Sequence, residues 1–180
     1  MTSNESVNIS KSSKKTLTIQ NFKYPPTELY KYCYLYDSEK YKYAIVCIDT
    51  KHFVKIKLKR NPKGYDKVYA HMVKVLRNAL DIAQNKYNST EFIVLLDMSG
   101  SGMKQIDITF AKTLIVILEN TFTDNLKYCV VKNAPRLFKI VYKLIYPFID
   151  KVTRKKFMFE TKGKLSRITM NNIENNEHLG

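Results

Sequence analysis

Short apolar runs typical of strands alternate with segments of helical period along most of this chain. Strands are predicted at 43–48, 53–58, 91–96, 126–131 and 157–159. Helices are predicted at 67–87, 104–120 and 135–149. The residues after 163 are expected to be irregular or to form a short helix. This alternation predicts an α/β layer fold whose sheet is either covered on both faces or curved around a pocket.

The composition is that of one globular domain behind a polar tail. Residues 1–20 are rich in Ser, Asn and Lys and are predicted to be disordered, and residues 21–180 are predicted to form a single domain. No apolar run approaches the ~20 residues that span a bilayer, and the N-terminus lacks an apolar signal-like segment. The cysteines Cys33, Cys47 and Cys129 have neither metal nor disulfide spacing. We therefore expect a cytoplasmic protein whose membrane contact is transient and peripheral.

Positive charge is the unusual feature of the composition. The chain has 31 Lys and Arg against 16 Asp and Glu, a net charge of +15, which favours nucleic acid or an anionic lipid surface as partner. No zinc finger or basic-aromatic RNA-binding strand occurs, and most of the 13 Tyr and 9 Phe lie at core spacing. Nucleic acid is therefore not the expected partner, and the residues alone leave open whether the basic surface is merely solvated or meets an anionic membrane surface.

Residues with catalytic potential do not gather into a known motif. Gly100-Ser101-Gly102 lacks the third glycine, or the Gly-Lys-Ser/Thr sequence, of a phosphate-binding loop. Asp97 has no His or second carboxylate near it in sequence, and Ser99 lacks the Gly-x-Ser-x-Gly pattern of a nucleophile elbow. The chain is therefore not expected to be an enzyme, and no metal or other cofactor is expected.

The helix predicted at 135–149 is apolar on most sides, and bases follow its end. Its apolar residues include Ile140 and the six that would form a cover: Leu137, Phe138, Val141, Leu144, Ile145 and Phe148. Pro135 suits the first position of a helix, where its missing N–H needs no partner. Such a helix should be buried or should cover something apolar. The bases that follow are either a solvated helix end or an anion site, and the residues alone leave both open.

Three segments together resemble a known family. The first is the strand that ends in Leu96-Asp97-Met98-Ser99-Gly100, and the second is Asn133-Ala134-Pro135-Arg136-Leu137-Phe138. The third is Tyr146-Pro147-Phe148-Ile149-Asp150, with Thr153 and Lys156 following at fixed spacing. Over roughly residues 30–180 the chain resembles the CRAL-TRIO lipid-binding domain, in its phosphatidylinositol-transfer branch and without the N-terminal helical subdomain.

The resemblance implies a mixed sheet with flanking helices and an apolar lipid pocket closed by a gate helix, here the helix at 135–149. It implies that Thr153 and Lys156 bind the headgroup of a phosphatidylinositol-type lipid and that Asp124 helps to place the lysine. Lys151, Arg154 and Lys155 would then face the membrane. Phosphatidylcholine is not favoured, because Phe92 and Val94 occupy positions where binders of that lipid carry small hydroxyl residues.

The function implied is that of a carrier that binds phosphatidylinositol or a phosphoinositide and moves it between membranes. Two alternatives lie within the family resemblance: a protein-interaction scaffold, and a carrier of another hydrophobic ligand. A basic nucleic-acid-binding domain is a third alternative, and it predicts tight, salt-sensitive binding without lipid exchange.

Overall fold

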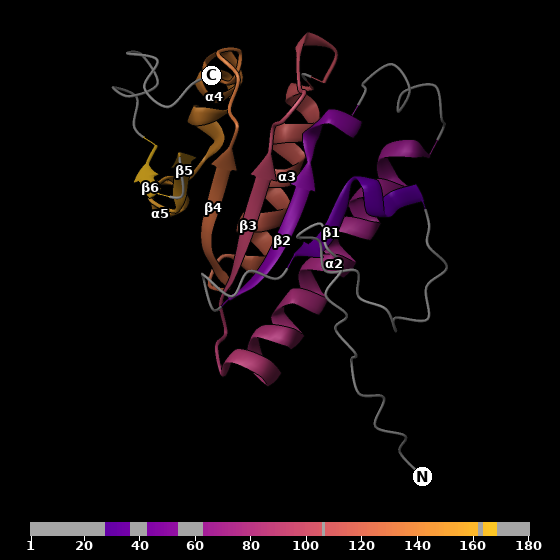
Figure 1. Cartoon of the computed structure of the whole chain (residues 1–180), viewed down its shortest axis with the longest axis vertical. Coiled ribbons are helices and arrows are strands. Elements are labelled where there is room, and N and C mark those ends of the chain that lie inside the picture. Colours follow the sequence, from indigo (N-terminus) through magenta and orange to yellow (C-terminus); the bar gives the residue numbers. More distant parts are fainter. Residues whose placement is uncertain (1–27, 37–42, 54–62, 106, 162–163, 169–180) are drawn as a thin grey trace.

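A six-stranded mixed sheet forms the centre of the molecule (Figure 1). The computed structural model describes residues 28–36, 43–53, 63–105, 107–161 and 164–168. The strands follow one another in sequence order: β1 Cys33–Tyr36, β2 Ala44–Asp49, β3 Phe92–Asp97, β4 Leu126–Lys132, β5 Phe157–Thr161 and β6 Lys164–Arg167. Strands β2 to β5 are parallel, and β1 and β6 pair antiparallel at the two edges.

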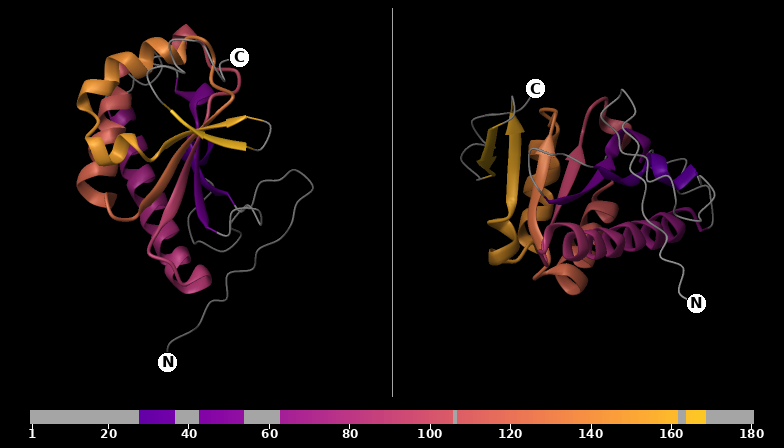
Figure 2. Two further views of the ribbon diagram at one scale, coloured as in Figure 1. Left: turned by 90° about the vertical axis from the view of Figure 1, so that its left-hand side faces the viewer. Right: turned by 60° about the horizontal axis from the view of Figure 1, so that its bottom comes forward.

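The crossover helices lie together on one face of this sheet (Figure 2). They are α2 Gly64–Tyr87, α3 Ile108–Phe122 and α4 Phe138–Ile145, and the short α5 Lys151–Arg154 precedes β5. Crossovers between parallel strands are nearly always right-handed. Because the strand order never reverses, each right-handed crossover returns over the same face.

Short 3₁₀ turns join these elements: η1 Glu28–Lys31, η2 Thr50–His52, η3 Met103–Gln105 and η4 Tyr146–Phe148. The main core lies between the helices and the inner face of the sheet. Its α2 stripe is the one predicted from helical spacing, with Val68, Met72 and Leu76 buried. On the opposite face, Ile45, Ile93 and Val130 form a smaller buried cluster.

The predicted α/β class and the strands β2, β3, β4 and β5 are confirmed. The prediction of an irregular or helical segment after residue 163 was wrong, because Lys164–Arg167 pairs with β5 as an antiparallel hairpin. Strand β1 was not predicted. Most of the strand expected at 53–58, and the tail expected at 1–20, lie outside the described residues.

Two helices begin later than the sequence predicted. Helix α3 starts at Ile108 because Asp107 caps it, accepting a hydrogen bond from the Phe110 backbone at 3.2 Å. Helix α4 starts at Phe138, whose backbone N–H donates to the Pro135 carbonyl at 2.8 Å in a preceding turn. At its other end the α-helix gives way to the tighter turn η4, since Pro147 has no N–H to continue the α-helical ladder.

Candidate functional site

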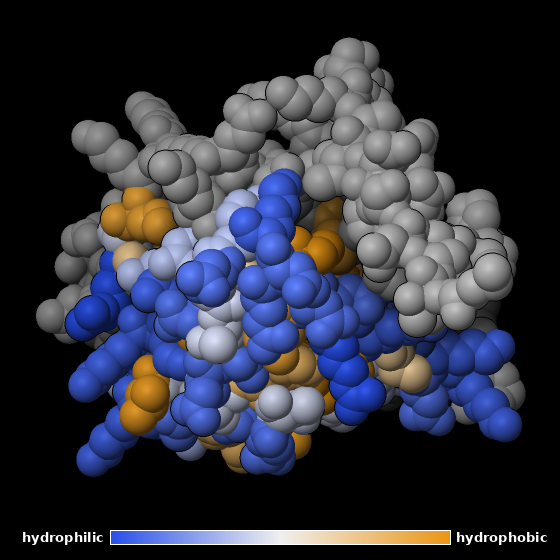
Figure 3. All heavy atoms as spheres, turned by 90° about the horizontal axis from the view of Figure 1, so that it is seen from below, coloured by the Kyte–Doolittle hydropathy of each residue, from blue (hydrophilic) through white to orange (hydrophobic). Residues whose placement is uncertain are grey.

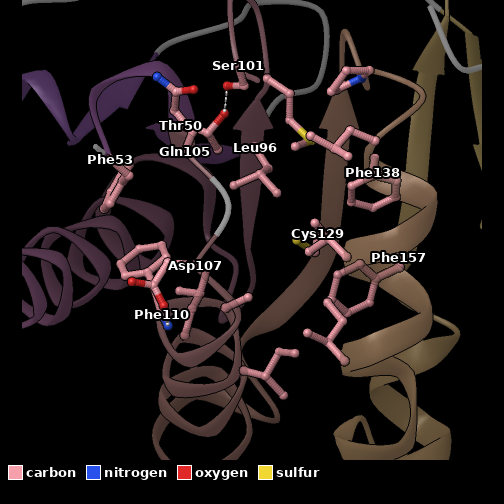
Figure 4. Close-up of a pocket in the computed structure, with 18 of the residues that line it drawn as sticks. Thr50, Phe53, Leu96, Ser101, Gln105, Asp107, Phe110, Cys129, Phe138 and Phe157 are labelled. Atoms are coloured by element: carbon pink, nitrogen blue, oxygen red, sulfur yellow. Dashed lines mark hydrogen bonds between the residues drawn. The ribbon is translucent and has the colours of Figure 1, made fainter. Parts of the chain in front are cut away.

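An apolar cavity lies between the sheet, α3 and α4 (Figure 4). Its floor consists of Leu96 on β3, Cys129 on β4 and Phe157 on β5. Its walls come mainly from two helices: Phe110, Ala111, Leu114, Ile115 and Leu118 of α3, and Phe138, Val141 and Ile145 of α4, with Leu137 just before it. The cavity volume is about 100 Å³, which is below the roughly 300–1,000 Å³ of typical ligand pockets. A lipid-sized ligand would therefore need a wider cavity than this one.

Polar groups gather at one end of the cavity, where the parallel strands end. The Thr50 hydroxyl donates a hydrogen bond to the Asp97 carbonyl oxygen at 3.0 Å and also hydrogen-bonds the Ser101 hydroxyl. Gln105 accepts a hydrogen bond from the Gly102 backbone at 2.9 Å, and the Asp107 carboxylate accepts one from the Tyr65 hydroxyl. No Lys or Arg occurs among the described residues that line the cavity. The cavity is therefore suited to an apolar chain rather than to a charged group.

Two of the segments that carry the family resemblance, 96–100 and 133–138, meet beside this polar end. Asn133 takes a left-handed backbone conformation with φ 54°, and its amide nitrogen donates to Asp97 at 3.0 Å and to Ser99 at 2.7 Å. Burial acts to raise the pKa of Asp97, but hydrogen bonds from Ser99 and Asn133 lower it below its ordinary value. These residues thus tie the ends of β3 and β4 together and set the start of the segment leading to α4.

The cysteine nearest the ligand space is not a reactive thiol. Cys129 lies in the cavity floor, and burial raises its pKa to about 12. Burial also raises the pKa of Cys47, to about 11, on the neighbouring strand β2. Both thiols are therefore protonated at neutral pH and act as apolar side chains.

Helix α4 presents apolar side chains on both of its faces. Phe138 and Ile145 are buried against the cavity, and Leu137 and Val141 line it while partly exposed. On the outer face Ile140 is 54% exposed and Leu144 is 50% exposed, and Phe148 of η4 is 54% exposed. The six residues predicted for the gate helix thus divide into a cavity-facing set and an outward-facing pair, Leu144 and Phe148.

Cation–π contacts hold the end of α4 in place. The Lys112 ammonium on α3 lies 3.7 Å from the Phe148 ring centroid. The Arg154 guanidinium on α5 lies 3.9 Å from the Tyr146 ring centroid, and its Nη2 donates to the Tyr146 carbonyl at 3.0 Å. Contacts of this kind contribute roughly 0.5–2 kcal/mol each, depending on exposure. Turn η4 is therefore the point at which α3 and α5 restrain α4.

The three residues predicted to bind a headgroup lie close together near α5, outside the cavity lining. Thr153 is buried, and its backbone N–H donates to Asp150 at 3.0 Å. The Lys156 ammonium donates to the Thr123 carbonyl at 2.6 Å, and this places it beside Asp124, which is exposed. Among the described residues, Lys156 forms no ion pair with Asp124. The residue after Lys156 is Phe157, which belongs to the cavity floor.

The residues predicted to face a membrane differ in their surroundings. Lys151 and Lys155 are exposed, whereas Arg154 is only partly exposed because it packs on Tyr146. Sequence spacing did not reveal this contact, nor the polar end formed by Thr50, Ser101 and their neighbours. Side chains alternate between the two faces along β3 and β4. This alternation would have indicated that Leu96 and Cys129 face the cavity, since each shares a face with buried neighbours.

Within the described part of the chain, no three His, Cys, Asp or Glu side chains come together to hold a metal ion. No helix in that part is both long and apolar enough to cross a membrane. A mixed sheet that floors an apolar cavity, with a mostly apolar helix as its cover, is an architecture suited to a hydrophobic ligand. The CRAL/TRIO domain family matches residues 28–176. The chain belongs to this family.

Individual relatives agree with that assignment. A CRAL-TRIO domain-containing protein of Caenorhabditis elegans, T23G5.2, is 34% identical over 68 residues, which cover 36% of this chain and 10% of the worm protein. Protein real-time of Drosophila pseudoobscura pseudoobscura is 32% identical over 69 residues, which cover 37% of this chain and 10% of the fly protein. The matches thus span about a tenth of the length of these relatives.

The crystal structure of Sfh5 has the same fold. It aligns with a TM-score of 0.56 at 23% identity, covering 73% of this chain and 49% of the Sfh5 chain. At this level of identity the likeness shows the fold alone.

Proposed function

We propose that this chain binds one phosphatidylinositol-type lipid in the cavity and carries it between membranes. The observation that supports this most is the two-sided character of α4, which covers an apolar cavity with one face and exposes Ile140 and Leu144 on the other. Swinging α4 outward would open the cavity and bring its outer side chains against a bilayer. Each acyl CH₂ that then enters the cavity is worth ~0.8 kcal/mol.

Exposed charge at α5 supports docking to an anionic membrane. Lys151 and Lys155 are exposed next to Val152, which is 58% exposed. Seen from below, the described surface is mostly hydrophilic with separate apolar patches set among hydrophilic side chains (Figure 3). A basic side chain near an anionic surface contributes about 1 kcal/mol, so these lysines would hold the protein while α4 opens.

We assign the headgroup to the cluster of Thr153, Lys156 and Asp124. In this structure the Lys156 ammonium donates a hydrogen bond to the Thr123 carbonyl. A lipid phosphate or inositol hydroxyl would replace that carbonyl as its partner. Phosphatidylcholine is not proposed as a ligand, because Phe92 and Val94 are fully buried in the core and offer no polar contact.

A vesicle-to-vesicle transfer assay tests the proposed function. Donor vesicles would contain fluorescent phosphatidylinositol or fluorescent phosphatidylcholine, and acceptor vesicles would contain anionic lipid. We expect the protein to accelerate movement of phosphatidylinositol and not of phosphatidylcholine. Absence of phosphatidylinositol or phosphoinositide movement above the spontaneous rate would refute the proposal.

A further inference from the structure

Two buried polar atoms lie without a partner between α4 and α5. One is the hydroxyl of Tyr142, a residue that is 0% exposed. The other is Nε of Arg154, which is buried although the guanidinium as a whole is partly exposed. Neither atom has a hydrogen-bond partner among the described residues. Because buried polar groups are nearly always paired, these two atoms require a physical explanation.

The two residues share one environment. The Tyr142 ring centroid lies 5.8 Å from that of Tyr146, and the Arg154 guanidinium stacks on the Tyr146 ring at 3.9 Å. Burial raises the pKa of Tyr142 to about 12, and the charge of Arg154 acts against that rise. The Arg154 guanidinium is therefore close enough for its charge to act on the Tyr142 hydroxyl.

Both atoms call for the same kind of partner. The Nε–H of arginine can only donate a hydrogen bond, and a tyrosine hydroxyl donates readily to an anion. Arg154 forms no ion pair with a carboxylate of the described residues, and the nearby Asp150 is occupied with the backbone N–H groups of Val152 and Thr153. The missing partner is thus a hydrogen-bond acceptor, and beside the charge of the guanidinium a phosphate oxygen is well suited to that place.

Tyr142 and Arg154 lie close to the cavity, on the far side of Phe157. The Phe157 ring lines the cavity, and its centroid lies 6.1 Å from that of Tyr142. Ile145, about one turn further along α4 from Tyr142, also lines the cavity. A displacement of α4 or of the Phe157 side chain would connect the cavity to the two unpartnered atoms.

We propose that Tyr142 and Arg154 form a phosphate site beneath α4, filled by the phosphate of a lipid headgroup or by free phosphate. In its lipid form the proposal rests on the proposed function. The Tyr142 hydroxyl and the Arg154 Nε–H donate to phosphate oxygens, and the Thr153 and Lys156 cluster contacts the rest of the headgroup.

Tyr142→Phe is the decisive variant because it removes only the hydroxyl. That hydroxyl has no partner in the unliganded chain, so the variant should unfold at the same temperature as the wild type or higher. Its transfer of fluorescent phosphatidylinositol should fall about tenfold or more, since hydrogen bonds to charged groups are the stronger kind. Its uptake of a fluorescent diacylglycerol, which has the chains but no phosphate, should be unchanged.

Arg154→Gln should produce the same selective loss. Lys67→Gln is its matched control, because it removes the same charge from an exposed position of α2. The readout is the ratio of phosphatidylinositol to diacylglycerol transfer, which cancels any change in how easily α4 opens. If Tyr142→Phe and Arg154→Gln keep the wild-type ratio while the wild type moves phosphatidylinositol, the site is overturned and the proposed function stands.

Inorganic phosphate separates the two sources. If the wild type moves no phosphatidylinositol, yet inorganic phosphate raises its unfolding temperature and raises that of neither Tyr142→Phe nor Arg154→Gln, the site takes free phosphate and only the carrier function fails. If the wild type neither moves the lipid nor responds to phosphate, both proposals fail, and the two atoms share nothing more than a buried water.

Discussion

The contact between Lys112 and Phe148 should control how fast the cavity opens. It is the cation–π contact by which α3 holds the end of α4, at 3.7 Å from ammonium to ring centroid. Phe148 is 54% exposed, so the lower range for such contacts applies, about 0.5–1 kcal/mol. Lys112→Gln keeps a long polar side chain but removes the charge. The open form of α4 should then become about two to five times more populated.

The consequence is measurable as a lipid release rate. Protein loaded with fluorescent phosphatidylinositol would be mixed rapidly with excess acceptor vesicles, and Lys112→Gln should release lipid about two to five times faster than the wild type. Lys104→Gln is the matched control, since Lys104 is an exposed cation of η3. Both variants lose one positive charge, and only Lys112→Gln loses the contact with Phe148. Release no faster than in the control would refute the role given to this contact.

Three further predictions concern the headgroup cluster, the cap of α5 and the cavity. Lys156→Ala should lower phosphatidylinositol transfer about ten- to hundredfold while diacylglycerol uptake and the circular dichroism spectrum are retained, and transfer by the control Lys67→Ala, at an exposed position of α2, should stay at the wild-type level. At Asp150, burial acts to raise the pKa, but hydrogen bonds from Thr153 and its neighbours hold it at about 2, below its ordinary value. Since the folded pKa lies below the unfolded one, the cap stabilises the folded state fully above about pH 4, and this stabilisation is lost as the pH falls toward 2. Asp150→Ala should therefore lower the free energy of chemical unfolding by about 1 kcal/mol at pH 7, and this difference should vanish as the pH falls over that range. Leu114→Trp should fill a cavity of about 100 Å³ and so reduce the lipid retained per chain in solvent extracts, without loss of the fold.

The parts of the fold that were predictable are those whose burial pattern is regular. Helix α2 shows a 3.6-residue stripe because one face packs on the sheet, and β2 is apolar at nearly every position because both of its faces are buried. Strand β6 lacks such a signal. Its residues Lys164–Arg167 are mostly polar, and only pairing with β5 makes them a strand.

The candidate site was less predictable because it is assembled from distant segments. The apolar positions of α4 were evident from spacing, since an amphipathic pattern is a local property. Which of them face the cavity was not, because this depends on where the helix starts, and the turn after Asn133 delays the start to Phe138. The packing of Arg154 on Tyr146 is a tertiary contact between α5 and η4 that no local pattern encodes.

The most direct test of the central claim is the identity of the lipid that the chain retains. Purified protein would be incubated with mixed vesicles of phosphatidylinositol, phosphatidylcholine and diacylglycerol, reisolated, and examined by native mass spectrometry and by analysis of its solvent extract. The account predicts one phosphatidylinositol-type lipid per chain, retained in preference to the other two. A chain that retains no lipid, or retains the three without preference, would contradict it.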